Sequence, residues 1–385
     1  MARTTTTMKK ALVAGLAASI ALPGLAAAQI GGFDVEIPKD DKAAKPKKQQ
    51  IVDVRLDSSW KGPKTIEDAM RLVKEGGEIV VHPGVYSPEF IKLKKSVSIR
   101  GIRDEYGEAP TLVADGGCLS VASDKVAARV TDVVFKASDA TCITVSKGQL
   151  ELADAEVQGR NAGYYRPAAY GHSSVFNSAA ASSPKSALVS IRGGRVSIEN
   201  TKLVGGEAGV FIKPSTTGNA FDQVSLRDST VSQMTGAGVV MVGKVDAMLS
   251  GNSIMQNGQG GIVYNASGHA RMVGNIVSNN THLGVFIEGN DLGAVAVEGN
   301  QIHDNTSNGI VVRAGTTILA GNQIGDHAEC RVKKDALNDG SSAHLAKPPI
   351  NLLADAQGVN AFVMKGGCDK GKPEKKKSRR WGLFS

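Results

Sequence analysis

The stretch that decides the fold is residues 251–327, which divides into GNSIMQNGQGGIVYN from 251, GNIVSNNTHLGVFIE from 274, GNQIHDNTSNGIVVR from 299 and GNQIGDH from 321. One set of asparagines recurs at spacings of 23, 25 and 22 residues, namely Asn252, Asn275, Asn300 and Asn322. A second set follows five residues behind the first, namely Asn257, Asn280 and Asn305. A fixed period in the low twenties with short apolar runs is typical of a parallel β-solenoid, in which each period forms one coil.

The residue types within the period predict the corners and the core of each coil. Asparagine tolerates a left-handed backbone and bonds nearby backbone groups, so stacked asparagines suit a repeated corner and can form a ladder from coil to coil. Gly261, Gly284 and Gly309 open the next apolar run, where we expect them to allow positive φ. Two apolar columns should face the core: Val210, Val239, Ile262, Val285 and Ile310, and Ile212, Met241, Tyr264, Ile287 and Val312.

The N-terminal part of the repeat region carries three further segments, TIEDAM from 65, GGEIVVHPGVY from 76 and IKLKKSVSIRG from 91. Together they resemble the opening coil of right-handed parallel β-helix proteins of the pectin-lyase-like superfamily, and are similar to the starts of pectinesterases and of periplasmic β-helix proteins involved in nitrous oxide reductase maturation. The resemblance implies an all-β right-handed parallel β-helix over about residues 60–327, which at this period makes about ten or eleven coils. It implies little about activity, because one fold hosts many chemistries.

A short helix over Thr65–Glu75 is predicted ahead of these coils. Thr65 is a suitable N-cap with Asp68 three residues on, the apolar residues share one face, and Gly76 ends the pattern. The first coil of a solenoid has an open end that needs covering, so we expect this helix to cap it.

The remaining segments read as targeting and linking sequence. Residues 1–28 have a basic start, an apolar run and an A-x-A site, which predicts a signal peptide cleaved after Ala28. Residues 29–50 form a charged linker, 51–364 the β-helix domain, and 365–385 a basic tail. No later run approaches the about 20 apolar residues of a membrane span. We therefore expect an exported monomer in the periplasm or outside the cell.

The net charge of +8 is concentrated outside the predicted β-helix. The tail 365–385 alone has eight Lys and Arg against Asp369 and Glu374. Nucleic acid is therefore not an expected partner of the folded body. The segment 375–385 joins basic residues to Trp381 and Phe384, which suits contact with an anionic membrane surface; a solvated tail is the other interpretation.

Four cysteines remain after the signal peptide. Cys118 and Cys142 are 24 residues apart with matching neighbours, so they should lie on adjacent coils at disulfide distance. Cys330 and Cys368 would then clip the C-terminal segment. Four free thiols are the alternative.

The period breaks once, where the insertion 160–186 doubles the step from Asp154 to Asn200. Long loops are often functional, and aromatic rings suit stacking on sugars. The candidate substrate-binding residues in the insertion are Tyr164, Tyr165, Arg166, Tyr170 and His172. An ordinary loop packed on the solenoid would explain them equally well.

Aligning the coils predicts one outward column after the apolar strand, made of Arg192, Lys213, Val242, Asn265, Glu288 and Arg313. Arg192 and Lys213 would be neighbours able to meet a carboxylate, and Lys213 would lie three coils from Glu288, about 14 Å away. Substrate binding is predicted for Arg192, Lys213, Asn265 and Arg313. A simple salt bridge between Glu288 and Arg313 is the competing interpretation.

His303 and Asp304 form the candidate general base and its orienting carboxylate. The sequence HDNTSNGI resembles the His-Asp loop of mannuronan C5-epimerases, although Gln301 and Ile302 stand where that family has Asp-Pro. His282 lies one coil earlier, and Glu288 and Lys213 complete the candidate catalytic set. Both histidines could instead be variants of the asparagine corner.

These features favour a protein that binds, and in one hypothesis processes, an acidic polysaccharide by lyase or C5-epimerase chemistry. The alternative is a non-catalytic envelope or surface protein that binds glycan or membrane through its loop and tail. The motifs of polygalacturonases, pectate lyases and pectinesterases are absent. No cofactor is evident, because no clustered His and Cys ligand set marks a metal site. Calcium held by outward carboxylates is the alternative left open, although no tight acidic cluster marks a site for it.

Overall fold

The computed structural model describes residues 50–138, 140–160, 162–163, 184–214, 222–288, 294–314, 316–325, 332–334 and 367–369. The predicted signal peptide, the predicted linker up to residue 49 and the predicted basic tail beyond Asp369 lie outside these residues, as does the whole segment 335–366. All the described residues belong to one unit, Lys48–Ser385.

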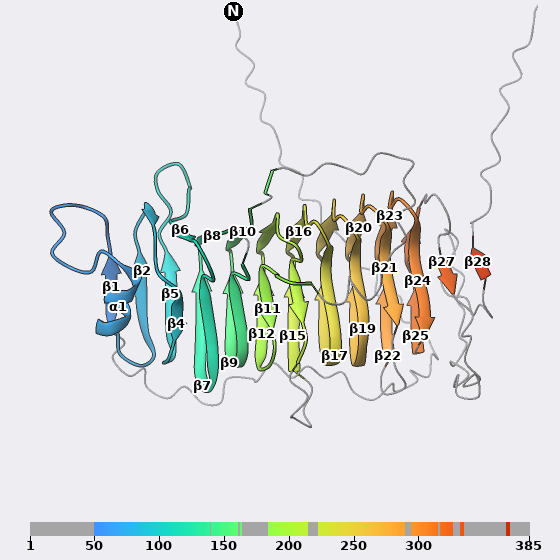
Figure 1. The fold of residues 1–385 in the computed structure, drawn as a ribbon, viewed down its shortest axis with the longest axis horizontal. Coiled ribbons are helices and arrows are strands. Elements are labelled where there is room, and N and C mark those ends of the chain that lie inside the picture. Colours follow the sequence, from blue (N-terminus) through green and yellow to red (C-terminus); the bar gives the residue numbers. More distant parts are fainter. Residues whose placement is uncertain are drawn as a thin grey trace, which may run out of the picture. The chain divides into compact units, whose positions relative to one another are not determined.

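Each coil contributes three short strands, and equivalent strands of successive coils pair in parallel, so the coils stack as a β-helix with three faces (Figure 1). Face 1 contains β1 (Ile51–Val54), β2 (Gly77–Val81), β5 (Val97–Gly101), β12 (Arg195–Glu199), β15 (Asp222–Arg227), β22 (Ala294–Glu298) and β25 (Thr316–Ala320). Face 2 contains β3 (Val85–Tyr86), β6 (Thr111–Ala114), β8 (Val134–Ala137), β10 (Glu156–Gln158), β13 (Lys202–Val204), β16 (Thr230–Ser232), β18 (Ser253–Met255), β20 (Ile276–Ser278), β23 (Gln301–His303) and β26 (Gln323–Ile324). Face 3 contains β4 (Ile91–Leu93), β11 (Val189–Ile191), β14 (Val210–Ile212), β21 (Leu283–Glu288), β24 (Asn308–Ala314), β27 (Val332–Lys334) and β28 (Gly367–Asp369).

Four long strands run from face 3 of one coil into face 1 of the next, namely β7 (Leu119–Thr131), β9 (Ile143–Ala153), β17 (Ala237–Ser250) and β19 (Gly260–Val273). Faces 1 and 3 therefore form one 18-stranded sheet, while face 2 is a separate ten-stranded sheet. The last described pair departs from the rule, because β28 lies antiparallel to β27.

Both predicted core columns are confirmed. Val239 pairs with Val210 on one side and with Ile262 on the other, and the same register carries the second column through Met241 and Tyr264. All ten side chains are at most 8% exposed and lie in the central core cluster.

The corner between faces 1 and 2 contains the first asparagine ladder, buried and fully bonded. The Oδ1 of Asn275 accepts from the backbone N–H and the Nδ2 of Asn252, while its own Nδ2 donates to the carbonyl of Leu249 and to Asn300. The second ladder, at the corner between faces 2 and 3, repeats this pattern through Asn257, Asn280 and Asn305.

The left-handed residue at each corner precedes the ladder asparagine, which corrects the expectation that the ladder residues are themselves left-handed. Positive φ occurs at Gly251, Gly274, Gly299 and Gly321 at the first corner, and at Gln256, Asn279 and Asp304 at the second. The ladder asparagines are thus free to turn their amides inward and bond the next coil.

The glycines that open the face 3 strands serve close packing, and not positive φ as predicted. A Cβ on Gly284 would lie 2.5 Å from the carbonyl oxygen of Gly309 and 2.8 Å from Ile302 Cγ2. Gly261 is crowded in the same way by Val277 and Gly284. A side chain at this position would therefore push successive coils apart.

The predicted helix is present as α1 (Ile66–Leu72), shorter than expected at its C-terminal end. Thr65 is the N-cap, and its side chain accepts from the backbone N–H of Asp68 at 3.1 Å. Ile66 and Ala69 are buried, and the helix contacts β1 and β2 of the first coil, as a cap would.

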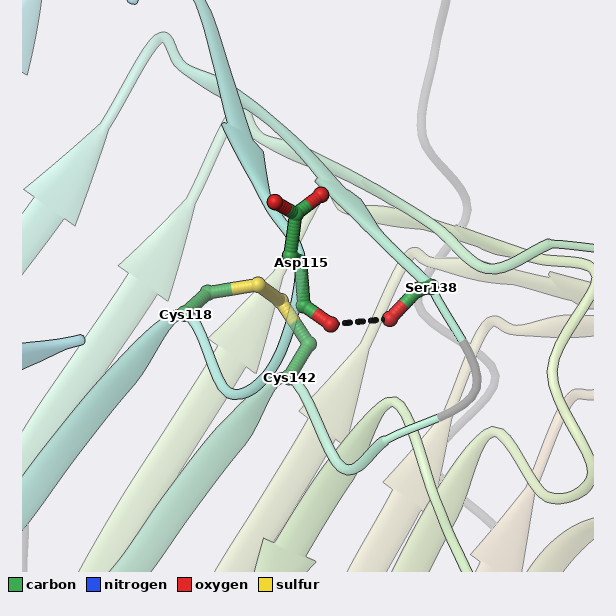
Figure 2. The surroundings of a disulfide bond; sticks show 4 residues. All are labelled: Asp115, Cys118, Ser138 and Cys142. Atoms are coloured by element: carbon green, nitrogen blue, oxygen red, sulfur yellow. Dashed lines mark hydrogen bonds between the residues drawn. A yellow bond between two sulfur atoms is a disulfide. The ribbon is translucent and has the colours of Figure 1, made fainter. Parts of the chain in front are cut away.

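Figure 2 shows the predicted disulfide between adjacent coils, Cys118–Cys142, with a Cα–Cα distance of 4.6 Å. Both cysteines are buried, and the Oγ of Ser138 donates to the carbonyl of Asp115 beside them. The second predicted pair cannot be compared, because Cys330 lies outside the described residues.

Candidate functional site

The outward column predicted from the sequence runs along the end of face 3, and we call it the edge row: Arg192, Lys213, Val242, Asn265, Glu288 and Arg313. Arg192 and Lys213 directly follow the paired residues Ile191 and Ile212, and Val242 pairs with Asn265. The row thus takes one side chain from each coil at a spacing of about 4.8 Å.

Arg192 and Lys213 are the exposed cations of the edge row. The backbone N–H of Lys213 donates to the carbonyl of Ile191, which fixes the two residues on neighbouring coils. Among the described residues, no carboxylate forms a salt bridge with either side chain. Two adjacent cations that are not neutralised make this end of the row a positive spot.

The other end of the edge row is neutralised internally. Arg313 Nη1 lies 3.5 Å from Glu288 Oε1, as the salt-bridge interpretation predicted, and the guanidinium also lies 5.1 Å from the centre of the Phe286 ring. The strand register shifts between Ile287 and Glu288, so Glu288 pairs with Ala314. Glu288 is half-buried and forms a salt bridge with Arg313, so its carboxylate has a structural partner.

The second candidate group lies at the corner between faces 2 and 3, on the side of face 3 opposite the edge row. His303 ends β23 on face 2, and Asp304 occupies the left-handed corner that follows. His303 Nδ1 is 2.7 Å from Asp304 Oδ2, so the two side chains form a His-Asp pair. His282 lies one coil earlier, where its carbonyl accepts from Ser307.

The structure does not bring the five candidate catalytic residues together. β21 runs from Leu283, beside the corner, to Glu288, at the edge, so about 16 Å of strand separates the two groups. His282, His303 and Asp304 form the corner group, while Lys213 and Glu288 belong to the edge row.

Between the two groups lies a row of outward side chains that the sequence analysis missed, and we call it the middle row of face 3. In pairing order it contains Lys92, Ser120, Thr144, Ser190, Phe211, Val240, Val263, Phe286 and Val311. The row is polar up to Ser190 and apolar from Phe211 onward. The available signal was the run of consecutive apolar residues in segments such as GVFI, which is typical of strands buried on both sides.

The insertion residues Tyr164, Tyr165, Arg166, Tyr170 and His172 lie outside the described residues. The described residues on either side of the insertion lie at the corner between faces 2 and 3, because β10 precedes it and β11 follows it. There the backbone N–H of Gly163 donates to Gln233 Oε1 at 2.7 Å.

A shallow cavity of about 300 Å³ lies on face 2, far along the coil from the edge row, and Arg103, Glu156, Lys202 and Asp228 are among its lining residues. Its cations are paired, Arg103 with Asp132 at 3.0 Å and Lys202 with Glu156 at 3.0 Å. The cavity therefore offers no unpaired cation to an anionic ligand.

Within the described ranges, no group of three or more His, Cys, Asp or Glu side chains could hold a metal ion. In the same ranges, no helix has the length and apolar character needed to cross a membrane.

Comparison with known families gives a match to the model of the right-handed β-helix region over residues 169–324, which contains both asparagine ladders. The fold of the chain is a right-handed parallel β-helix. This confirms the fold implied by the resemblance of its N-terminal segments to the pectin-lyase-like superfamily. Comparison with curated protein sequences finds no match.

Several solved structures are similar in fold. The A-module of the mannuronan C-5 epimerase AlgE6 of Azotobacter vinelandii is 12% identical with a TM-score of 0.49, covering 69% of this chain and 72% of its own. Pectate lyase Pel9A is 13% identical with a TM-score of 0.39, covering 72% and 79%. The periplasmic alginate epimerase AlgG is 12% identical with a TM-score of 0.28, covering 66% and 77%. At these identities and TM-scores the similarity concerns the fold alone.

Proposed function

We propose that this protein binds an acidic polysaccharide on face 3, with Arg192 and Lys213 as the central contacts. The observation that carries the proposal is their position on neighbouring coils, exposed and without a described carboxylate partner. A sugar carboxylate placed between them would gain two charge-assisted hydrogen bonds.

The polar half of the middle row supports a glycan ligand over other anions. Ser120 and Thr144 present hydroxyl groups at coil spacing beside the cations, and Lys92 adds a further exposed charge. A repeating polymer can follow such a ladder of donors from coil to coil, because successive coils repeat at about 4.8 Å, close to the length of one sugar unit.

Binding without catalysis is the form of the function that the geometry favours. The cations that would hold a uronate carboxylate and the His303–Asp304 pair lie on opposite sides of face 3, with apolar side chains between them. A base must lie within hydrogen-bond reach of the proton it removes, and a separation of about 16 Å along the strand prevents that for one sugar unit.

Lyase or epimerase activity remains the second candidate, favoured by one observation. The 2.7 Å contact between His303 and Asp304 has the geometry of a base and its orienting carboxylate. In this proposal His303 would remove the C5 proton at the corner, from a substrate segment that reaches across from the edge row. The insertion tyrosines would then line the corner side of the ligand.

The binding proposal is tested by affinity electrophoresis of the mature protein in gels containing alginate, polygalacturonate or neutral dextran. Retardation by the two acidic polymers alone is expected. Arg192→Ser/Lys213→Ser should weaken binding about tenfold, since two exposed charge contacts contribute about 1.4 kcal/mol together. Lys74→Ser/Lys136→Ser, which removes two exposed cations away from face 3, is the matched control and should bind normally. Equal loss in both variants would reduce the interaction to net charge and overturn the site.

Catalysis is tested separately. The protein is incubated with the same polymers while ultraviolet absorbance reports unsaturated products and proton NMR reports epimerised sugars. Binding without either product would establish the non-catalytic function. Product formation that is lost in His303→Ala and kept in His282→Ala would instead establish the enzyme.

Localisation belongs to the same proposal. An exported protein in the periplasm or outside the cell would meet such polymers, and the basic segment 375–385 would add contact with an anionic membrane surface. Cell fractionation of the full chain, with and without residues 1–28, measures both the compartment of the protein and the fraction that is bound to membranes.

A further inference from the structure

The apolar half of the middle row is buried although it faces away from the core. Val240, Val263 and Phe286 are at most 1% exposed, and they form a second cluster separate from the central core. Their neighbours Val239 and Met241 in the same strand occupy the core instead. Both sides of these strands are therefore shielded from water.

The described chain does not account for this shielding. The described elements that contact β17, β19, β21 and β24 extensively are strands of the same or adjacent coils, lying in the same two sheets. No described element forms a second layer over face 3. Neighbouring strands cover an outward valine only from the sides, so the strands do not account for the burial of this row.

We propose that the segment 335–366 packs along the outer surface of face 3 and covers the apolar row from Val311 to Phe211. The segment starts after β27, which pairs with β24 next to Val311, and it ends at β28, which pairs antiparallel with β27. Both of its ends are thus anchored at the C-terminal end of the row.

The length and composition of the segment fit this position. The apolar row spans four coil steps, about 19 Å. About thirty residues leaving and returning to one place can reach up to about 50 Å outward, so the row is within range. The segment supplies two apolar clusters, Ile350 with Leu352 and Leu353, and Phe362 with Val363 and Met364.

The polar first half of the middle row indicates how far along face 3 the segment should extend. From Lys92 to Thr144 the outward side chains are polar and at least partly exposed, and they need no cover. The segment should therefore stop near Phe211, which leaves Arg192 and Lys213 accessible. This inference stands independently of polysaccharide binding.

The test is photo-cross-linking in the full-length mature protein. Phe286→p-benzoylphenylalanine and Phe211→p-benzoylphenylalanine keep an aromatic ring at each end of the row, and irradiation followed by peptide mass spectrometry identifies what lies against them. We expect cross-links to peptides from 335–366 at both positions. Thr144→p-benzoylphenylalanine, in the polar half, should give none to that segment.

Three outcomes would overturn the proposal. These are cross-links from both phenylalanine positions to the insertion 164–183 or to residues 29–49, a covalent dimer on a denaturing gel, and no cross-link at either position. A second measurement uses Ile350→Ser/Leu352→Ser/Phe362→Ser, which should raise binding of a hydrophobic dye severalfold by uncovering the row. Leu383→Ser/Phe384→Ser is the matched control. Unchanged dye binding in the first variant would contradict the assignment.

Discussion

The coils from Gly251 onward and the coils from Asp132 to Asp228 make the same corner with different residues. In the later coils a left-handed glycine precedes a buried asparagine, as in Gly274 and Asn275. In the earlier coils the left-handed residue is Asp132, Asp154, Asn200 or Asp228, and the residue that follows is Val133, Ala155, Thr201 or Ser229. The corner therefore needs left-handed backbone, but it does not need an amide ladder.

The two regions differ in what ties one coil to the next. In the later coils, amide side chains bond both neighbours, and Ser229 connects to this ladder through its backbone N–H to Asn252 Oδ1 at 3.0 Å. In the earlier coils the covalent link Cys118–Cys142 joins adjacent coils instead. A buried ladder is stabilising only while every member is bonded, whereas a disulfide acts alone. The two regions should consequently respond differently to single changes.

The largest effect is expected for Asn275→Leu in the middle of the first ladder. Its side chain makes four hydrogen bonds, and removing them takes this partner from the Leu249 carbonyl, from the backbone N–H of Asn252 and from the side-chain amides of Asn252 and Asn300, all of them buried. The free energy of unfolding should fall by about 4 kcal/mol, measured by urea denaturation followed by circular dichroism. The control is Asn279→Gly at an exposed left-handed corner, which should change little. A small loss for Asn275→Leu would mean that the ladder is dispensable.

Removal of the disulfide by Cys118→Ala/Cys142→Ala comes next. Opening a loop closed over 24 residues should lower the free energy of unfolding by about 3 kcal/mol. Hydrogen exchange should rise in β7 and β9 and stay unchanged in β19 and β22, because the ladder region has its own ties. An equal rise throughout would show that the two regions unfold as one unit and would remove the distinction between them.

The ladder region was predictable because its residues repeat in kind and in spacing. Asn252 and Asn275 fixed the register, the register fixed the core columns, and matching neighbours fixed the pairing of Cys118 with Cys142. The role of Gly284 was not predictable, because the crowding comes from the backbone of the next coil and leaves no mark on its own φ. The left-handed position was misplaced by one residue for a similar reason, since both residues of a Gly-Asn pair tolerate that conformation.

The candidate site was predicted less completely than the fold. Column alignment placed Glu288 beside Arg313 correctly, because both follow in-register strands. It did not reveal that the outward neighbours of the core columns are also apolar, since an alternating pattern was assumed where Val240 and Phe286 continue an apolar run. That row is what separates His303 from the edge row. Substrate binding by the insertion residues between 164 and 172 stays a prediction.

Two glycines of the ladder region distinguish the two constraints on it, which are the close packing of successive coils at Gly284 and the left-handed backbone at Gly274. Gly284→Ala should cost about 2 kcal/mol, since its Cβ would overlap the Gly309 carbonyl and Ile302. Gly274→Ala meets open space and should cost about 1 kcal/mol, from positive φ alone. Urea midpoints of the two variants give the order directly. If Gly274→Ala were the more damaging, the backbone conformation of the corner, and not the packing of coils, would be the limiting feature, and the earlier coils with Asp corners should then be the weaker half.

Alkaline pH gives the smallest expected effect, and one buried tyrosine in each region should contribute to it. Burial raises the pKa of the Tyr264 phenol, whose hydroxyl donates to the Gly268 carbonyl at 2.9 Å in the core of the ladder region. The unfolded chain loses this proton near pH 10 while the folded protein keeps it, so the unfolded state binds fewer protons and stability falls as pH rises above about 10. At pH 10.5 the contribution is about 0.8 kcal/mol, and Tyr264→Phe should remove it from the pH profile of the unfolding free energy. Burial also raises the pKa of Tyr86 in the early coils, so Tyr86→Phe should flatten the profile in the same direction, whereas Tyr106→Phe at an exposed position should not. Hydrogen exchange around β19 that increases at pH 10.5 only when Tyr264 is present would assign that share of the alkaline sensitivity to the ladder region, while profiles that stay parallel for Tyr264→Phe and the native chain would contradict it.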